Sequence, residues 1–246
     1  MSGKDQPKIL PLGSDALLLR FSEAFSEPAN RAALAFRAAF LKEGIKGITE
    51  SATSLTSCLI RFDPEMTSRS AINEAMADKL AANDWFQAEL PEGRAHWRIP
   101  AAFGGEHGPQ LSEAAELAGL GNEGAVRDIC DTRLRVLAIG FAPGQPYLGF
   151  LKDHWDIPRQ TQVTPQVPPG AVVVAVKQVI PFSNAAPTGW RQIGRTAFRC
   201  YDRGAKQAIA LRPGDEVQFQ EVSSGDLNTL LEKPKPNGGA TRKEIA

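Results

Sequence analysis

The sequence predicts two domains: an α+β domain over residues 1–91, then a mainly-β domain over residues 92–225. Three observations support this division. Strand and helix signals alternate through the first ninety residues. The stretch "LPEGR" at 90–94 combines Pro and Gly, as a hinge does. Beyond it, many short apolar runs are punctuated by Pro and Gly, which is typical of a closed or nearly closed β-barrel.

Within the first domain, "SEPANRAALAFRAAFLKEG" reads as a helix that Ser26 caps and Gly44 closes. Pro28 suits its first turn. Strand signals and a second amphipathic helix complete the domain: strands at 15–21, 45–51 and 54–63, and the helix at 70–82. The order β-α-β-β-α-β predicts a split βαβ, ferredoxin-like domain.

The second domain opens with a strand-like run, "AHWRIPAAF", and two short helices. The expected helices cover 111–119 and 122–131, and the expected later strands cover 134–142, 171–179, 189–196 and 216–222. The last segment, 226–246, ends in a polar stretch rich in Pro and Gly. It is predicted to be a disordered tail.

Composition excludes several classes of partner and site. Lys+Arg and Asp+Glu both number 28, so no basic excess favours nucleic acid. No apolar run is long enough to span a membrane, and "MSGKDQPKIL" lacks the apolar core of a signal peptide, so a cytoplasmic location is expected. The three cysteines are too far apart for a metal knuckle or a redox pair, and the histidines lack zinc-site spacing. We therefore expect buried free thiols and no metal site.

The stretch "FGGEHGPQL" at 103–111 is the first candidate site segment. Its paired glycines permit backbone conformations that can expose N–H groups toward a ligand. Glu106 and His107 could accept and donate protons there, and they are the candidate catalytic residues. The alternative is a tight strand-to-helix turn with two exposed polar residues.

The stretch "PGQPYLG" at 143–149 is the second candidate. Pro143 and Pro146 fix two φ angles, and Gly144 permits a bend, so the loop is stiff and has a preset shape. Tyr147 offers a ring for packing and a hydroxyl that needs a partner. The loop is either a structural corner of the barrel or a wall of a binding site, which makes Pro143, Gly144 and Tyr147 candidate binding residues.

The third candidate, "PTGWRQIGRT", holds Trp190, Arg191 and Arg195. In a regular strand the two arginines share one face, where they could hold a carboxylate or phosphate in bidentate fashion. They could equally be solvated or paired with nearby acids.

Taken in order, "GGEHGPQL", "GFAPGQPYLG", "VPPGAV", "GWRQIGRT" and "LRPGDEVQF" resemble the family of 5-oxoprolinase B-type subunits. This family is also called allophanate hydrolase subunit 1, or carboxyltransferase domain subdomains C and D. "SLTSCLIRFDP" near the N-terminus adds to the resemblance, which covers roughly residues 8 to 222. It implies an α/β domain followed by a cyclophilin-like β-barrel.

The resemblance also implies a function. Family members act with a C-type subunit, which carries a second cyclophilin-like half, and often with an A-type subunit. The assembled enzyme opens 5-oxoproline with ATP, so this chain is expected to be the B-type subunit of such a hydrolase, acting on a small cyclic amide or urea-like substrate. ATP would be bound with the partner, because the chain has no nucleotide motif of its own. Tyr147 and Gln178 would hydrogen-bond the substrate, and Arg195, or else Arg159, would hold its carboxylate or a phosphoryl group, beside Trp190.

The chain departs from the family pattern at informative places. His107 and Gln110 stand where the family has Phe and Asp, and Gln145 replaces the Phe of "PGFPYLG". The family's "GIAG" becomes "VVAV" at 173–176, and two arginines become Thr164 and Gln166. These changes predict a divergent member whose substrate differs from 5-oxoproline or whose activity is weak.

Two other functions stay open on the sequence. The family includes an inhibitor of a sporulation histidine kinase, so the chain could be a non-catalytic binding module with Tyr147 as its anchor. It could also be a stand-alone carrier of a small molecule in the barrel mouth.

Overall fold

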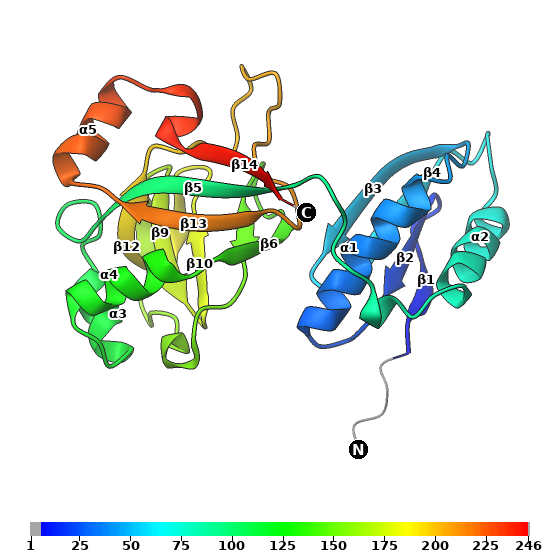
Figure 1. Ribbon diagram of the computed structural model, residues 1–246, viewed down its shortest axis with the longest axis horizontal. Coiled ribbons are helices and arrows are strands. Elements are labelled where there is room, and N and C mark those ends of the chain that lie inside the picture. Colours follow the sequence, from blue (N-terminus) through cyan, green and yellow to red (C-terminus); the bar gives the residue numbers. More distant parts are fainter. Residues whose placement is uncertain (1–5, 246) are drawn as a thin grey trace. The chain divides into compact units, whose positions relative to one another are not determined.

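The structure is a computed structural model that describes residues 6–245. Residues 1–5, which include half of "MSGKDQPKIL", and residue 246 lie outside the described part. The chain divides between Gly93 and Arg94 into two compact units, here called unit 1 and unit 2 (Figure 1). Each unit has a hydrophobic core of its own, so each is described by itself.

Unit 1 is a four-stranded antiparallel sheet covered by two helices (Figure 1). The strands lie in the order β1-β2-β4-β3, so β4 lies between the two strands that α1 connects. The elements are β1 (Lys8–Leu12), β2 (Ala16–Arg20), α1 (Glu27–Leu41), β3 (Ile48–Ser54), β4 (Ser57–Phe62), α2 (Arg69–Ala81) and the 3₁₀ turn η1 (Trp85–Gln87).

The predicted β-α-β-β-α-β order is wrong at both ends, and a ferredoxin-like split is not confirmed. An additional strand, "KILPL", precedes the first predicted strand. It is an edge strand that pairs on one side only, and proline is tolerated in edge strands, which accounts for Pro11. After α2, unit 1 adds η1 and no further strand among its described residues. The observed order is therefore β-β-α-β-β-α.

Helix α1 forms as its sequence predicts. Ser26 accepts a hydrogen bond from the Ala29 amide at 3.3 Å and caps the helix. Phe36 and Phe40 lie on the buried face, stacked with ring centroids 5.5 Å apart, and Trp85 packs edge-on against Phe36 at 5.1 Å. At fifteen residues α1 is too short to span a bilayer, and no other helix among residues 6–245 has the length and apolar character to do so.

Unit 2 is mainly β, which confirms the predicted class of the second domain. Its main strands lie in the order β7-β6-β13-β5-β12-β9-β10, and β8 pairs with β11 in a small separate ladder. Helices α3 and α4 lie on one side of β5 and β13, and α5 lies on the other (Figure 1). The elements are β5 (Arg94–Phe103), α3 (Leu111–Leu117), α4 (Asn122–Asp131), β6 (Leu134–Ile139), β7 (Pro146–Leu148), η2 (Asp153–Trp155), β8 (Thr164–Val167), β9 (Ala171–Ala175), β10 (Gln178–Pro181), β11 (Ala186–Thr188), β12 (Arg191–Thr196), β13 (Glu216–Glu221), α5 (Ser224–Glu232), η3 (Pro236–Gly239) and β14 (Thr241–Ile245).

The main sheet of unit 2 returns on itself. Gln178, at the start of β10, forms a β-bridge with Phe150, just after β7. The Leu151 amide also donates to the Lys177 carbonyl at 2.7 Å. The two ends of the strand order therefore meet, which leaves little of the sheet edge unpaired. That this closed sheet is cyclophilin-like remains a prediction.

The prediction of a disordered tail over 226–246 is wrong for the described residues. Ser223 caps α5 by accepting from the Asp226 amide at 3.1 Å, and β14 pairs antiparallel with Arg94–Arg98 of β5. The polar composition of the segment led to the prediction. On one side of β5, however, β12 pairs only with the second half of the strand, so the first half is open to another partner. Pairing with that edge orders a segment whose composition alone indicates disorder.

Candidate functional site

A cleft of about 470 Å³ opens on unit 2 and brings together segments that are far apart in the sequence. Of the candidate binding residues, Tyr147, Arg159 and Trp190 line it. The full lining is Phe141, Gln145, Tyr147, Arg159, Gln160, Val163, Ile180, Phe182, Pro187, Thr188, Gly189 and Trp190. Its size is in the range of small-molecule sites.

Apolar packing holds the floor of the cleft. Ile180, Phe182 and Trp190 are buried and belong to a small hydrophobic cluster separate from the main core of unit 2. Alternate residues of β9, Ala171, Val173 and Ala175, belong to the same cluster, and Tyr147 packs against it while staying half-buried. The guanidinium carbon of Arg159 lies 5.7 Å from the centroid of the Trp190 ring, a cation–π geometry at the edge of the cleft.

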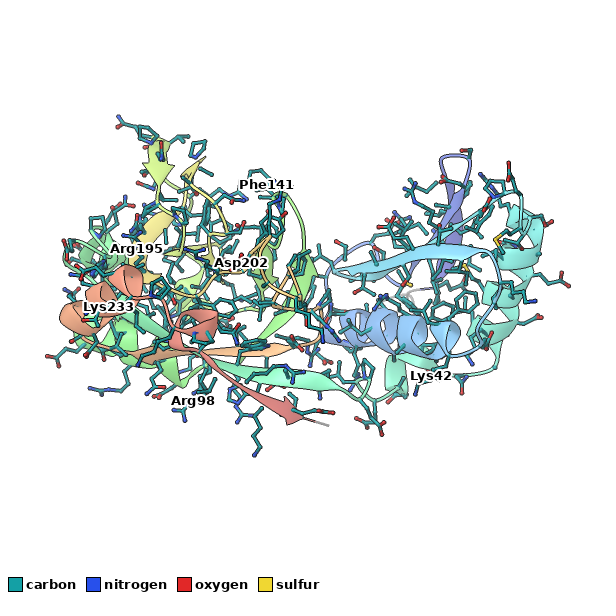
Figure 2. All side chains as sticks on the ribbon, turned by 90° about the horizontal axis from the view of Figure 1, so that it is seen from above. Lys42, Arg98, Phe141, Arg195, Asp202 and Lys233 are labelled. Carbon is teal, nitrogen blue, oxygen red and sulfur yellow. The ribbon has the colours of Figure 1, made fainter. Side chains whose placement is uncertain are left out.

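The loop before β7 forms one wall of the cleft. Gly144 has φ +70°, and a Cβ there would lie 2.6 Å from the Cys200 carbonyl oxygen, so only glycine lets the loop approach that backbone. Pro143 is exposed beside it. Phe141 also has a positive φ, +72°, and its side chain is 83% exposed at the surface of unit 2 (Figure 2). A phenylalanine in the left-handed backbone region costs on the order of 1–2 kcal/mol, and such strain is typical of functional loops.

Gln145 is the most constrained polar side chain of this wall. It is only 3% exposed, and its Oε1 accepts from Ser183 twice, from the amide at 2.8 Å and from Oγ at 3.1 Å. A backbone amide can only donate, so the carboxamide oxygen must face Ser183. The Nε2 group is thereby turned away from Ser183, on a side chain that lines the cleft.

Glutamine side chains connect Gln160 of the cleft lining to the "GGEHGPQL" turn. Gln160 donates to the Trp190 carbonyl at 2.9 Å and accepts from Gln110 Nε2. Gln110 Oε1 in turn accepts from the Gln192 amide at 2.9 Å, and Gln192 Nε2 donates to the His107 carbonyl at 2.8 Å. The turn is therefore linked to the cleft lining through a chain of hydrogen bonds.

Neither candidate catalytic residue belongs to the cleft lining. The His107 side chain is 4% exposed and that of Glu106 is 69% exposed, with His107 Nε2 and Glu106 Oε1 3.5 Å apart. The buried Nε2 of His107 has no hydrogen-bond partner among residues 6–245. Glu106 Oε1 accepts from Asn228 of α5 at 3.3 Å, so the segment predicted to be disordered reaches this turn.

The remaining predicted residues also lie outside the lining. Gln178 Nε2 donates to the Leu148 carbonyl at 3.1 Å, which places this side chain at the closure of the sheet. Arg195 lies apart from Phe141 (Figure 2), and its Nε donates to the Pro169 carbonyl at 3.4 Å. Arg191 is buried in an ion pair with Glu113, at 2.8 Å. The alternative that these arginines pair with nearby acidic residues, and not with a ligand, therefore holds for Arg191.

Sequence reasoning missed several residues of the cleft. Val163, Phe182 and Thr188 come from loops and short strands with no sequence signal of their own. Gln145 and Phe141 lie within the "IGFAPGQPYLGFL" stretch and could have been found, since the first departs from the family pattern and the second precedes a Pro-Gly turn.

The charge of the cleft indicates what it can bind. Arg159 is its one cation, and among the described lining residues there is no Asp or Glu. No cluster of His, Cys, Asp or Glu that could hold a metal ion occurs among residues 6–245. The lining thus suits a small ligand with an apolar body and an anionic or acceptor-rich end.

Comparison with known families decides the family. A model of the carboxyltransferase domain, subdomain C and D, matches residues 7–211, which is most of the chain. The chain belongs to this carboxyltransferase domain family. The resemblance of the motifs is thereby confirmed.

Relatives of this carboxyltransferase-domain chain include the 5-oxoprolinase B-type subunit of Bacillus subtilis (strain 168). The two are 28% identical over 236 residues, covering 92% of this chain and 97% of the relative. The solved structure of TTHA0988 superposes with a TM-score of 0.70 at 31% identity, over 85% of this chain. The chain spans only 40% of that longer protein.

A more distant structure extends the fold. Kluyveromyces lactis urea amidolyase superposes with a TM-score of 0.71 over 98% of this chain and 16% of its own length. The identity is 16%, so this likeness concerns the fold alone. The same architecture therefore occurs as one part of a much larger enzyme.

Proposed function

We propose that the chain is the B-type subunit of an ATP-dependent hydrolase of the 5-oxoprolinase type, which opens a small cyclic amide or urea-like substrate together with a C-type partner. The observation that carries the proposal is the match to the Bacillus subtilis 5-oxoprolinase B-type subunit along 97% of the relative's length. The cleft supports it, because an apolar floor beside Arg159 suits a small ring that carries a carboxylate.

In this reaction ATP would transfer its γ-phosphoryl group to the amide oxygen and leave as ADP. Water would attack the carbonyl carbon, the ring C–N bond would break with a proton going to the nitrogen, and phosphate would be released. This chain would bind and orient the ring through Trp190, Tyr147 and Arg159, and would exclude water from its apolar face. The ATP chemistry is assigned to the complex with the C-type and A-type subunits, because the sequence has no nucleotide-binding motif.

The partner is proposed to cover the mouth of the cleft. Phe141, 83% exposed in a strained backbone conformation, offers an aromatic anchor at this rim, beside the exposed Val163 and Pro187. Glu106 and His107 stay candidates for proton transfer, although neither lines the cleft.

Copurification followed by assay tests the proposal. The chain, co-expressed with C-type and A-type subunits, should release glutamate from 5-oxoproline only when ATP is present and all subunits are included. Arg159→Gln should raise KM at least tenfold, since a charge-assisted hydrogen bond contributes roughly 1.5–3 kcal/mol. Failure of the chain to copurify with a C-type subunit would contradict the proposal.

Unchanged turnover in Glu106→Ala would remove Glu106 from the mechanism.

A further inference from the structure

Gln145 places an unused pair of hydrogen-bond donors at the cleft. Its Oε1 is occupied by both the amide and the hydroxyl of Ser183, whereas its Nε2 has no hydrogen-bond partner among the described residues. The side chain is 3% exposed and lines the cleft. Nε2 is not among the buried polar atoms that lack a partner, so its N–H groups are accessible to an acceptor on a water or a ligand in the cleft.

The backbone of the loop fixes this orientation further. The Gln145 amide donates to the Ala142 carbonyl at 3.0 Å, and the Gly140 amide donates to the Gln145 carbonyl at 3.0 Å. Gly144, the residue before Gln145, lies against the Cys200 backbone. The backbone of Gln145 and its Oε1 are thus both held in place. Little conformational entropy therefore remains to be lost when a ligand accepts a hydrogen bond from Nε2.

The other polar side chains of the cleft show what kind of ligand group would meet Nε2. Gln160 has both ends of its carboxamide in hydrogen bonds, and Thr188 Oγ1 accepts from the Trp190 amide at 3.0 Å. Arg159 can only donate. The available side-chain groups are therefore mostly donors, which require acceptor oxygens on the ligand.

We infer that Gln145 is a specificity-determining residue, which donates from Nε2 to a carbonyl oxygen of the ligand, and that Ser183 is the residue that positions it. The inference rests on the proposed function, because it assigns the acceptor to the carbonyl of a cyclic amide while Arg159 meets the carboxylate. A site built to hydrogen-bond one substrate atom discriminates strongly against an analogue that lacks it.

Two ring acids of similar size test the inference. 5-Oxoproline carries a ring carbonyl, and cyclopentanecarboxylate does not. Calorimetric titration of both into the full-length chain, alone and with its C-type partner, gives a ratio of dissociation constants. We expect the wild-type chain to prefer 5-oxoproline at least tenfold. Gln145→Leu, which keeps the apolar bulk, should bring this ratio close to one while leaving cyclopentanecarboxylate binding within about twofold.

Further variants separate a specificity role from a structural one. Gln145→Glu keeps the shape and lacks the donor, so it should weaken 5-oxoproline binding more than Gln145→Leu does. Ser183→Ala removes one of the two bonds to Oε1 and keeps the backbone one, so the ratio should fall about two- to threefold. Gln220→Leu, the same change at an exposed glutamine of β13 outside the cleft lining, is the matched control and should leave the ratio unchanged.

The possible results distinguish the inference from the proposed function. A wild-type chain that binds both acids equally, or a Gln145→Leu chain that is folded and keeps the wild-type ratio, overturns the role of Gln145 and leaves the proposed function standing. If neither acid binds to the chain or its complex, the inference is overturned, and copurification with a C-type subunit then decides the proposed function separately. A selective loss of the preference in Gln145→Leu supports the inference.

Discussion

His96 is a buried base held among cations, and this makes the stability of unit 2 depend on pH. It lies on β5, opposite Glu216 of β13 and Lys243 of β14. Burial, together with nearby Arg133 and Arg98, lowers its pKa below the ordinary 6.5, while Glu216 partly opposes the shift.

The sign of the pH effect follows from this lowered pKa. As pH falls below 6.5, the unfolded chain takes up a proton at His96 before the folded chain does, so the free energy of unfolding decreases. His96→Gln should therefore lose less stability than the wild type between about pH 7 and about pH 5. Urea denaturation at each pH measures this. Near pH 8, His96 is neutral in both the folded and the unfolded chain, so the difference in unfolding free energy between wild type and His96→Gln at that pH is the reference. If the unfolding free energies of the two proteins fell equally with pH, the prediction would be contradicted.

Single residues of the cleft were predictable only where their chemistry is visible in the sequence. The Pro–Gly loop and Trp190 were found because their residue types restrict the backbone or require burial. Gln145 was noticed only as a departure from a family pattern, since nothing local reveals that Ser183, thirty-eight residues later, fixes its amide. Glu106 drew attention by its chemistry, yet its position outside the lining follows from long-range packing.

At the scale of elements, the turn between β9 and β10 shows how tertiary contacts override local preference. The run "AVVVAVKQV" predicts one continuous strand, but the chain reverses at Val176 and Lys177, with φ of +44° and +63°. Two-residue hairpin turns of this kind strongly prefer Asn and Gly. Three backbone hydrogen bonds hold the turn against the 151–157 segment: Val176 to Ile157, Lys177 to Trp155 and Leu151 to Lys177.

Val176→Gly should stabilise the protein. A β-branched residue at positive φ costs about 1–2 kcal/mol, and glycine adds about 0.5–1 kcal/mol of unfolded-state entropy, so the net gain is of the order of 1 kcal/mol. The "GIAG" pattern of the family has its second glycine at this position. Thermal denaturation measures the gain as a rise in Tm. Val163→Gly, at an exposed valine without positive φ, is the control and should not stabilise; a Tm that falls in Val176→Gly would count against strain at this turn.

Helices were predicted more closely than strands because their signals are local. Helix α1 occupies Glu27–Leu41 within the expected 26–44, with Ser26 at its cap, and α2 occupies Arg69–Ala81 against the expected 70–82. Strand β1 was missed because prolines flank and interrupt its apolar residues. A strand is defined by its partner, and the partner lies outside any sequence window.

At the scale of the whole molecule, β5 organises unit 2 through partners from distant parts of the chain. It pairs in parallel with β13, about 120 residues later, and antiparallel with β12 and β14. None of these pairings has a local signal, which is why the sequence predicted a mainly-β domain but not the order of its strands. The motifs in order gave only a resemblance to the family, and the match of the family model to residues 7–211 confirmed it.

The C-terminal segment is therefore expected to be a structural part of unit 2. Ending the chain after Lys233 removes η3 and β14, leaves Arg94–Arg98 of β5 without a partner on one side, and uncovers the backbone of Ala197, against which Gly238 packs. At about 1 kcal/mol for each of a few net hydrogen bonds and lost contacts, the unfolding free energy of unit 2 should fall by roughly 2–4 kcal/mol.

Hydrogen exchange measured by mass spectrometry should show faster exchange in the first half of β5 of the shortened chain. Helix α1 of unit 1 serves as the internal control and should keep its protection. Unchanged exchange in β5 would mean that the segment adds nothing to stability, as a disordered tail would.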